Sequence, residues 1–234
     1  MPLYAMGDLH LSLSVDKPQD KFPGWENYVE RIRNNWTRLV GPEDTVVVCG
    51  DVSWAMKIGE AVEDFAFIDA LPGKKLILKG NHDYWWMTRK KLDAFLTEHG
   101  FSTISILFND SYVYESAQSG RVAICGTRGW SYDCEGEEDI KVLNRECGRL
   151  RMSLDSAPSD CGERVVFLHY PPVFADYRCD EIMDVLHQAG ITRCFYAHLH
   201  SYSQLRAVTG MYEGIDMRLV SADYVGFTPV LCCR

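Results

Sequence analysis

The chain has 234 residues, a mass of 26.7 kDa and a composition that is 47% hydrophobic and 12% aromatic, so it can bury a substantial core. Its 24 basic and 33 acidic residues give a formal net charge of −9, which argues against an enzyme that tracks long nucleic acids. It lacks both an apolar run of the ~18 residues that a membrane-spanning helix needs and a basic export signal at the N-terminus. We therefore expect a soluble cytoplasmic protein with no membrane partner, whose nine cysteines are reduced.

Apolar β-rich runs alternate with amphipathic helical patterns along the chain, which is typical of an α/β fold. In chain order the patterns predict a strand at Pro2–Met6, a helix within Gly24–Val40, a strand at Thr45–Cys49, a helix at Gly59–Ala70, a strand at Lys75–Lys79, a helix at Trp86–Glu98, a strand at Val122–Cys125, a helix at Glu137–Leu154, a strand at Arg164–Leu168, a helix at Asp180–Gln188 and a strand at Arg193–Ala197. Two later runs, Gln204–Val208 and Met217–Ser221, predict a C-terminal third that is richer in hairpins. No repeat or linker interrupts the pattern, so we expect one domain that spans residues 1–234.

Five of these strands stop at an Asp, Asn or His. In chain order they are followed by Asp8 and His10, by Asp51, by Asn81, His82 and Asp83, by His169, and by His198 and His200. In α/β sheets, ligands bind outside the carboxyl ends of the strands, so we expect these side chains to converge there.

Apart from His82 and Asp83, the strand-end residues combine two carboxylates, one amide and four imidazoles, with no thiolate. Mixed oxygen and nitrogen ligands of this kind suit Mn²⁺, Fe²⁺, Zn²⁺ or Mg²⁺. Asp8 and His10, like His198 and His200, are two residues apart, which places both side chains on one face of an extended segment. Each motif alone is weak, because Gly-Asp is a common turn and a lone His is more often structural. Together the motifs supply more ligands than one tetrahedral ion can bind, so they predict two divalent ions that share a carboxylate.

The same residues resemble the motifs of the calcineurin-like metallophosphoesterases, of the bacterial phosphohydrolase type, in the same order and over nearly the whole chain. The matching motifs are Asp8-x-His10, Gly50-Asp51, Gly80-Asn81-His82-Asp83, His169 and His198-x-His200. The resemblance implies a two-sheet β-sandwich flanked by helices, with four layers in the order α/β/β/α. One departure is Ala197, where the family usually has Gly, and this change removes no ligand.

The resemblance also implies how the ligands are shared and what the centre does. One ion would be bound by Asp8, His10, Asp51 and His200, and the other by Asp51, Asn81, His169 and His198. A hydroxide that bridges the two ions, about 3.5–4 Å apart, would attack phosphorus in line with the leaving group. His82 would then protonate the leaving oxygen as the general acid, and Asp83 would hold the His82 ring. Among the possible ions Mn²⁺ is our first expectation.

The motifs leave the substrate open. A small phosphomonoester or phosphodiester is the expectation, and a protein phosphatase or a nuclease of the same superfamily is the alternative. A non-catalytic scaffold of this fold is disfavoured, because such proteins lose ligands. Trp54, Tyr84, Trp85 and Trp86 follow the ligand-bearing turns, where they would either stack on a base or pack the rim of the core. The motifs do not indicate the oligomeric state.

A further candidate is Arg128, which lies between two glycines directly after the strand at Val122–Cys125. Its guanidinium would bind phosphate oxygens in a planar, two-pronged fashion. The segment at about 127–160 is longer than a simple connection, so we expect a cap-like insertion that presents Arg128 to the substrate. Tyr132, Arg145 and Arg149 could join it in that role. The alternative is that these arginines pair with acids such as Glu138 or Glu146.

Overall fold

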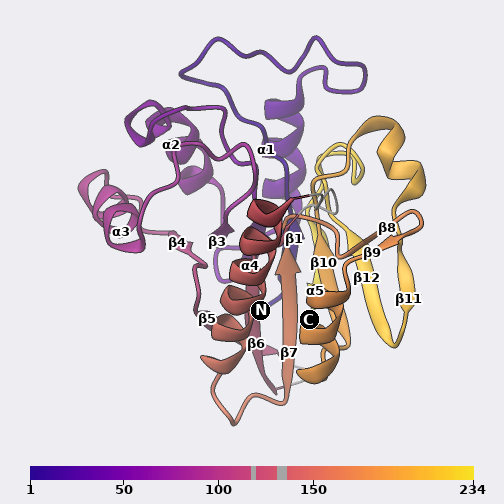
Figure 1. Cartoon of the computed structure of the whole chain (residues 1–234). Coiled ribbons are helices and arrows are strands. Elements are labelled where there is room, and N and C mark those ends of the chain that lie inside the picture. Colours follow the sequence, from indigo (N-terminus) through magenta and orange to yellow (C-terminus); the bar gives the residue numbers. More distant parts are fainter. Residues whose placement is uncertain (117–119, 131–135) are drawn as a thin grey trace.

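The computed structural model describes residues 1–116, 120–130 and 136–234. Two mixed β-sheets face each other (Figure 1). The first sheet contains, from edge to edge, Val230–Cys233 (β13), Leu3–Met6 (β1), Thr45–Cys49 (β2), Lys74–Leu78 (β3) and Ile104–Ile106 (β4). The second contains Gly210–Tyr212 (β11), Ile215–Leu219 (β12), Arg193–Tyr196 (β10), Glu163–Leu168 (β7), Gly120–Thr127 (β6) and Ser111–Ser116 (β5).

Helices cover the outer face of each sheet. They are Tyr28–Leu39 (α1), Val62–Ala70 (α2), Arg89–Glu98 (α3), Glu137–Asp155 (α4) and Asp180–Gln188 (α5). In the first half of the molecule, Ile32 and Trp36 of α1 pack in one cluster with Val46 and Val48 of β2. A second cluster joins α4 and α5 to the outer face of the second sheet.

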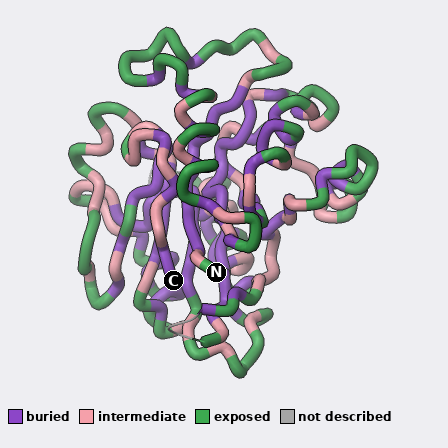
Figure 2. Tube along the Cα trace, turned by 180° about the vertical axis from the view of Figure 1, so that it is seen from behind, coloured by how far each residue is buried: buried purple, intermediate pink, exposed green. Residues whose placement is uncertain are grey.

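Between the sheets lies a third apolar cluster. It unites Val47 and Cys49 of β2 with Val165 and Phe167 of β7. Because successive strand residues point to opposite faces, the run from Val46 to Cys49 is buried on both sides of its sheet. Figure 2 shows the central strands as buried segments and the outermost loops as exposed ones. The four-layer α/β/β/α fold that the resemblance implied is confirmed.

The strand directions bring the functional turns to one edge. β1, β2, β3 and β4 are mutually parallel, and so are β6, β7, β10 and β12. The antiparallel strands β13, β5 and β11 lie at sheet edges. The carboxyl ends of the parallel strands therefore meet, as the sequence predicted.

The C-terminal hairpin differs from the prediction. Gln204–Val208 is not a strand: residues Ser201–Arg206 form a 3₁₀ helix (η2), and the partner of β12 is Gly210–Tyr212. Side chains stabilise this turn, because the Ser203 hydroxyl accepts the His200 N–H and Gln204 donates to a backbone carbonyl. Two short strands that the sequence did not predict, Val173–Phe174 (β8) and Tyr177–Arg178 (β9), form a small separate hairpin. The start of the helix predicted at Gly59–Ala70 is also different, because Ile58–Glu60 (η1) is a 3₁₀ turn before α2.

Most of the described part of segment 127–160 is α4, which connects the parallel strands β6 and β7 and packs on their sheet through Leu143 and Leu150. Residues 131–135, including Tyr132, lie outside the described residues, so the cap stays a prediction.

Among the described residues, no helix is both long enough and apolar enough to cross a membrane. The described cysteines are free thiols, and those of the predicted strands, Cys49, Cys125 and Cys194, are buried.

Candidate metal centre

The strand-end side chains converge at the carboxyl edge of the two sheets. Two overlapping sets of ligand atoms each lie within 4.8 Å: Asp8, His10 and His200 form one set, and Asp8, Asp51 and His169 form the other. Asn81 and His198 extend the second set, because the Asn81 side-chain oxygen lies 2.6 Å from His169 Nε2 and 2.9 Å from His198 Nδ1. All seven predicted ligands are thus brought together from five strand ends.

Asp51 belongs to the second set and also lies close to His10 of the first. Its Oδ1 accepts the backbone N–H of His82 at 2.7 Å, which fixes the carboxylate. Its Oδ2 lies 3.8 Å from His10 Nε2 and 3.6 Å from His169 Nε2. Asp8 is common to the two ligand sets and approaches their histidines with different oxygens, whereas a single oxygen of Asp51 faces a histidine of each set.

Two glycines allow this approach of the backbone. A Cβ at Gly80 would collide with the Asp51 carboxylate, and one at Gly50 would lie 2.6 Å from Gly80 Cα. Gly50 also has a φ of +80°, a region that favours glycine. The Gly-Asp and Gly-Asn motifs are therefore a packing requirement for Asp51 as well as turn signals.

Hydrogen bonds fix the tautomers of two candidate ligand histidines. His169 Nδ1 lies 2.9 Å from the Cys49 carbonyl oxygen, and His200 Nδ1 lies 2.9 Å from Asp223 Oδ1. Both partners accept only, so each Nδ1 carries the proton and each Nε2 directs a lone pair inward. A histidine that ligates a metal typically donates its other N–H in this way.

The backbone at the ligands is strained. Asp8, His10, Asp51 and His198 have φ values of 57°, 45°, 51° and 75°, in the left-handed region that non-glycine residues seldom adopt. Such conformations cost about 1–3 kcal/mol each and concentrate at functional sites. Ala197 does not share this conformation, and its methyl group is fully buried, so the missing family glycine is tolerated.

Burial and neighbouring groups set the charges in the cluster. Burial, with the nearby histidines, lowers the pKa of His10 and His169 well below the usual value and that of His198 to about 4. These rings are therefore neutral at pH 7, which is the form that binds metal. Burial also raises the pKa of Asp8 to about 6 and that of Asp51 well above its usual value. Two carboxylates thus lie buried beside three neutral rings.

The cluster fits divalent ions on these observations. Asp8 Oδ1 is buried without a hydrogen-bond partner. The Nε2 lone pair of His169 faces the Asn81 side-chain oxygen, so two acceptors oppose each other at 2.6 Å. A cation between such atoms would satisfy all of them, and the oxygen and nitrogen ligand set suits Mn²⁺ and related ions.

A comparison with protein families decides the classification. The model of the calcineurin-like phosphoesterases matches residues 1–202, a range that includes all seven candidate ligands. The chain belongs to the calcineurin-like phosphoesterase family. It is a phosphoester hydrolase of a metal-dependent family. No curated protein matches its sequence.

Solved structures agree on the fold of this phosphoesterase. A phosphopantetheinyl hydrolase from Mycobacterium tuberculosis superposes with a TM-score of 0.60 at 14% identity, over 99% of this chain and 95% of that one. A protein of unknown function from Aquifex aeolicus gives 0.51 at 16% identity, over 98% and 95%. A purple acid phosphatase from yellow lupin gives 0.50 at 12% identity, over 100% of this chain but 45% of that longer protein. Identities this low show the shared fold alone.

Asp83 has a different role from the one predicted. Its carboxylate is fully buried and accepts backbone N–H groups of Gly80 at 2.7 Å, Val52 at 2.8 Å and Asp51 at 3.0 Å. The expectation that Asp83 holds the His82 ring is therefore wrong: Asp83 fixes the turns that carry Asp51 and Asn81.

His82 lies at the edge of the cluster with other partners. Its Nδ1 is 3.4 Å from the Tyr84 hydroxyl, and its ring is 4.6 Å from that of Trp54. Burial lowers the pKa of His82, and the charges of His200 and Lys17 add to this effect. An anionic substrate beside the ring would counter that shift, because negative charge favours the protonated imidazole.

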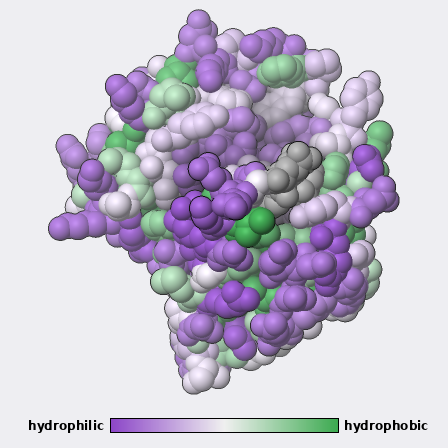
Figure 3. Space-filling view, viewed as in Figure 1, coloured by the Kyte–Doolittle hydropathy of each residue, from purple (hydrophilic) through white to green (hydrophobic). Residues whose placement is uncertain are grey.

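The aromatic residues near the turns divide between the two expected roles. Trp85 is buried in the core beside Phe65, so it packs only. Trp54 stacks on the His10 ring at 5.0 Å, and Tyr84 is 52% exposed next to His82. These two line the approach to the cluster. Figure 3 shows the surface hollowed above α4, with hydrophilic side chains around the hollow.

Asp223 is the residue of the site that sequence reasoning missed. It fixes His200, and together with Asp8 it outweighs the effect of burial, so the pKa of His200 is raised. It follows the predicted strand Met217–Ser221 by two residues, so the rule that found the other strand-end residues could have found it.

Arg128 does not stand alone at the tip of its turn. Its guanidinium lies 3.5 Å from Glu146 Oε1 and 4.8 Å from the ring centre of Trp130. Arg149 pairs with the same Glu146 oxygen at 2.6 Å, as the alternative interpretation proposed. Glu146 is fully buried, however, and is not a surface acid. Arg145 is exposed on α4.

Proposed function

We propose that the chain is a phosphohydrolase with a dinuclear metal centre that cleaves small phosphomonoesters or phosphodiesters. The observation that carries the proposal is the convergence of seven candidate ligand side chains from five strand ends, with imidazole nitrogens and side-chain oxygens directed at one another. Asp8, His10, Asp51 and His200 would hold one ion, and Asp51, Asn81, His169 and His198 the other. Mn²⁺ is the ion of first choice.

When bound, the two ions would supply Lewis-acid activation of water and charge compensation for the phosphoryl oxygens. The chain's own residues supply the rest. Asp51 would set the spacing of the two ions through its Oδ2, which faces His10 on one side and His169 on the other. His82, outside the ligand set but within 5.8 Å of the His10 ring, would protonate the leaving oxygen as general acid.

The positions of neighbouring groups support this division of labour. The Tyr84 hydroxyl beside His82 Nδ1 can orient the ring so that Nε2 is available to substrate. Arg128, whose carbonyl oxygen accepts the N–H of the proposed ligand His169, would bind substrate oxygens. The net charge of −9 favours small substrates over long nucleic acids.

A panel of phosphomonoesters, phosphodiesters and nucleotides, assayed with added Mn²⁺ and after chelation, tests the proposal. We expect hydrolysis of at least one small ester that disappears with chelation and returns with Mn²⁺. Hydrolysis that survives complete removal of metal would contradict the dinuclear mechanism, and inactivity on every phosphoester with both sites loaded would contradict the function.

A further inference from the structure

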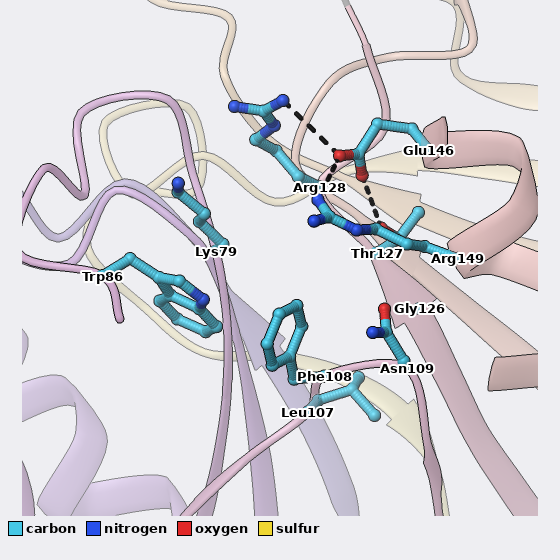
Figure 4. Close-up of a pocket in the computed structure, with 10 residues that line it drawn as sticks. All are labelled: Lys79, Trp86, Leu107, Phe108, Asn109, Gly126, Thr127, Arg128, Glu146 and Arg149. Atoms are coloured by element: carbon cyan, nitrogen blue, oxygen red, sulfur yellow. Dashed lines mark hydrogen bonds and ion pairs between the residues drawn. The ribbon is translucent and has the colours of Figure 1, made fainter. Parts of the chain in front are cut away.

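Beside the metal centre lies a pocket of which the proposed mechanism uses only Arg128. It is lined chiefly by Lys79, Trp86, Phe108, Arg128, Glu146 and Arg149, and we call it the cationic pocket (Figure 4). These residues come from the end of β3, from the loops before α3 and after β4, from the turn after β6, and from α4. The pocket is thus built where the two sheets meet.

The pocket carries more positive than negative charge. Its lining has three cations, Lys79, Arg128 and Arg149, and one carboxylate, Glu146, which leaves a net charge of +2. Within the part of the chain that the structure describes, Lys79 forms no hydrogen bond or ion pair. Arg128 Nε is buried without a hydrogen-bond partner. Unpaired donors of this kind favour an anion.

Glu146 orients the arginines without saturating them. It is fully buried, with Oε2 accepting the Thr127 hydroxyl at 2.8 Å and Oε1 accepting Arg149 at 2.6 Å. Arg128 reaches the same Oε1 at 3.5 Å. One oxygen thus draws two guanidinium groups together, and each keeps further N–H donors. Figure 4 shows the head groups of Lys79 and Arg128 on the same side of the pocket.

Two aromatic rings form the other wall. Trp86 and Phe108 meet edge to face with ring centres 5.8 Å apart, and Arg149 lies 5.6 Å from the ring centre of Phe108. The indole N–H of Trp86 is buried without a partner, which adds another unused donor. An apolar wall also lowers the local dielectric, so it strengthens a charge-assisted hydrogen bond.

The size of the pocket limits its ligand. Its volume is about 50 Å³. On the same scale, one water molecule needs about 10–15 Å³. That is room for roughly three to five water-sized atoms, which corresponds to a phosphate group and is too small for a nucleoside.

The backbone links the pocket directly to the metal centre. The Arg128 carbonyl oxygen accepts the N–H of His169 at 3.2 Å and that of Tyr170 at 2.9 Å. Lys79 precedes Asn81 by two residues on the same turn. A substrate with one phosphate at the metal centre could therefore place a second one in the pocket.

We propose that the cationic pocket binds a second phosphate group of the substrate, so that the enzyme prefers phosphoesters that carry two phosphates. This inference rests on the proposed function for the site of cleavage. It assigns Arg128 and Arg149 to substrate selection, and it names the substrate class as bis-phosphorylated small molecules. The competing explanation is that the arginines only compensate the buried charge of Glu146.

Kinetics on matched substrates test the preference. The Mn²⁺-loaded enzyme is assayed on a sugar monophosphate and on the corresponding bisphosphate. We expect the bisphosphate to be preferred in kcat/KM, and Arg128→Gln to lower that preference by roughly 10- to 100-fold, mainly through KM. Arg149→Gln, at a more exposed position, should also lower the preference for the bisphosphate. Arg151→Gln, an exposed arginine on the same helix, is the matched control and should leave the preference unchanged.

Binding of inorganic phosphate to the chelated full-length chain, followed by calorimetry, is a separate measurement that needs no turnover. Binding by the wild type that weakens in Arg128→Gln and Arg149→Gln but not in Arg151→Gln supports the pocket, even if every ester proves inert and the proposed function fails. An enzyme that hydrolyses monophosphate but shows no preference for bisphosphate overturns the inference while leaving the proposed function intact. Phosphate binding by an enzyme that hydrolyses esters without that preference overturns it as well, since the pocket would then serve free phosphate only.

Discussion

The metal centre and the cationic pocket are neighbours on one edge of the fold, yet they are built from opposite groups. In the centre, carboxylates and neutral imidazoles oppose one another, and Asp8 Oδ1 lacks any donor. In the pocket, Arg128 Nε is buried without an acceptor, and Lys79 has no acceptor among the residues that the structure describes. Unpaired acceptors thus remain in the centre and unpaired donors in the pocket.

This contrast indicates the sign of the charge of the ligand that each region would bind. Buried polar groups are normally paired, so an unpaired set of one sign marks the place of an external partner. The centre fits cations and the pocket fits an anion. With the ions held at the centre, a phosphoester bound there could place its second phosphate in the pocket.

The largest expected effect comes from Asp51, the carboxylate that faces both halves of the centre. Asp51→Asn should abolish activity and weaken both ions together, because it removes the charge from the shared ligand. Metal content and turnover are measured on the same preparation. Loss of only one ion with the other retained at full affinity would show that Asp51 does not bridge.

His82→Ala separates chemistry from metal binding. Metal content should stay near normal, while turnover falls by about 10²–10⁴-fold, because the general acid is missing. A nitrophenyl ester should lose less than an alkyl ester, since nitrophenolate leaves with little need for a proton. Equal losses on the two esters would argue that His82 binds metal or phosphate instead.

A smaller effect is expected at Asp223, which fixes the tautomer of His200 from outside the ligand set. Asp223→Asn should reduce metal affinity by about 10–100-fold, as the loss of such orienting partners typically does. Titration of the chelated protein with Mn²⁺ measures this affinity in the variant and in the wild type. Because Asp223 does not touch the pocket, inorganic phosphate binding should be unchanged, and a parallel loss of both would break the distinction between the regions.

The sequence predicted the centre better than the pocket for a physical reason. Each candidate ligand lies within four residues of the end of a strand, and parallel strands bring their carboxyl ends together, so local pattern was enough. The pocket joins Lys79, Trp86, Phe108 and Glu146 from separate elements. Their proximity depends on how the sheets pack, which no local pattern encodes.

The wrong predictions have the same origin. Asp83 is polar and follows a ligand, but its partners are backbone N–H groups of another turn, set by the close contact of Gly50 with Gly80. Gln204–Val208 has an alternating pattern, yet side-chain hydrogen bonds to the backbone favour a 3₁₀ turn there. In both cases a specific tertiary or side-chain bond outweighed the local signal.

The most direct test of the metal centre is anomalous scattering from crystals grown with Mn²⁺, measured on both sides of the manganese absorption edge. We predict two manganese positions per chain, with Asp51 in contact with both, His10 and His200 at one, and His169 and His198 at the other. A single tetrahedral ion with the remaining ligands dispersed would contradict the account.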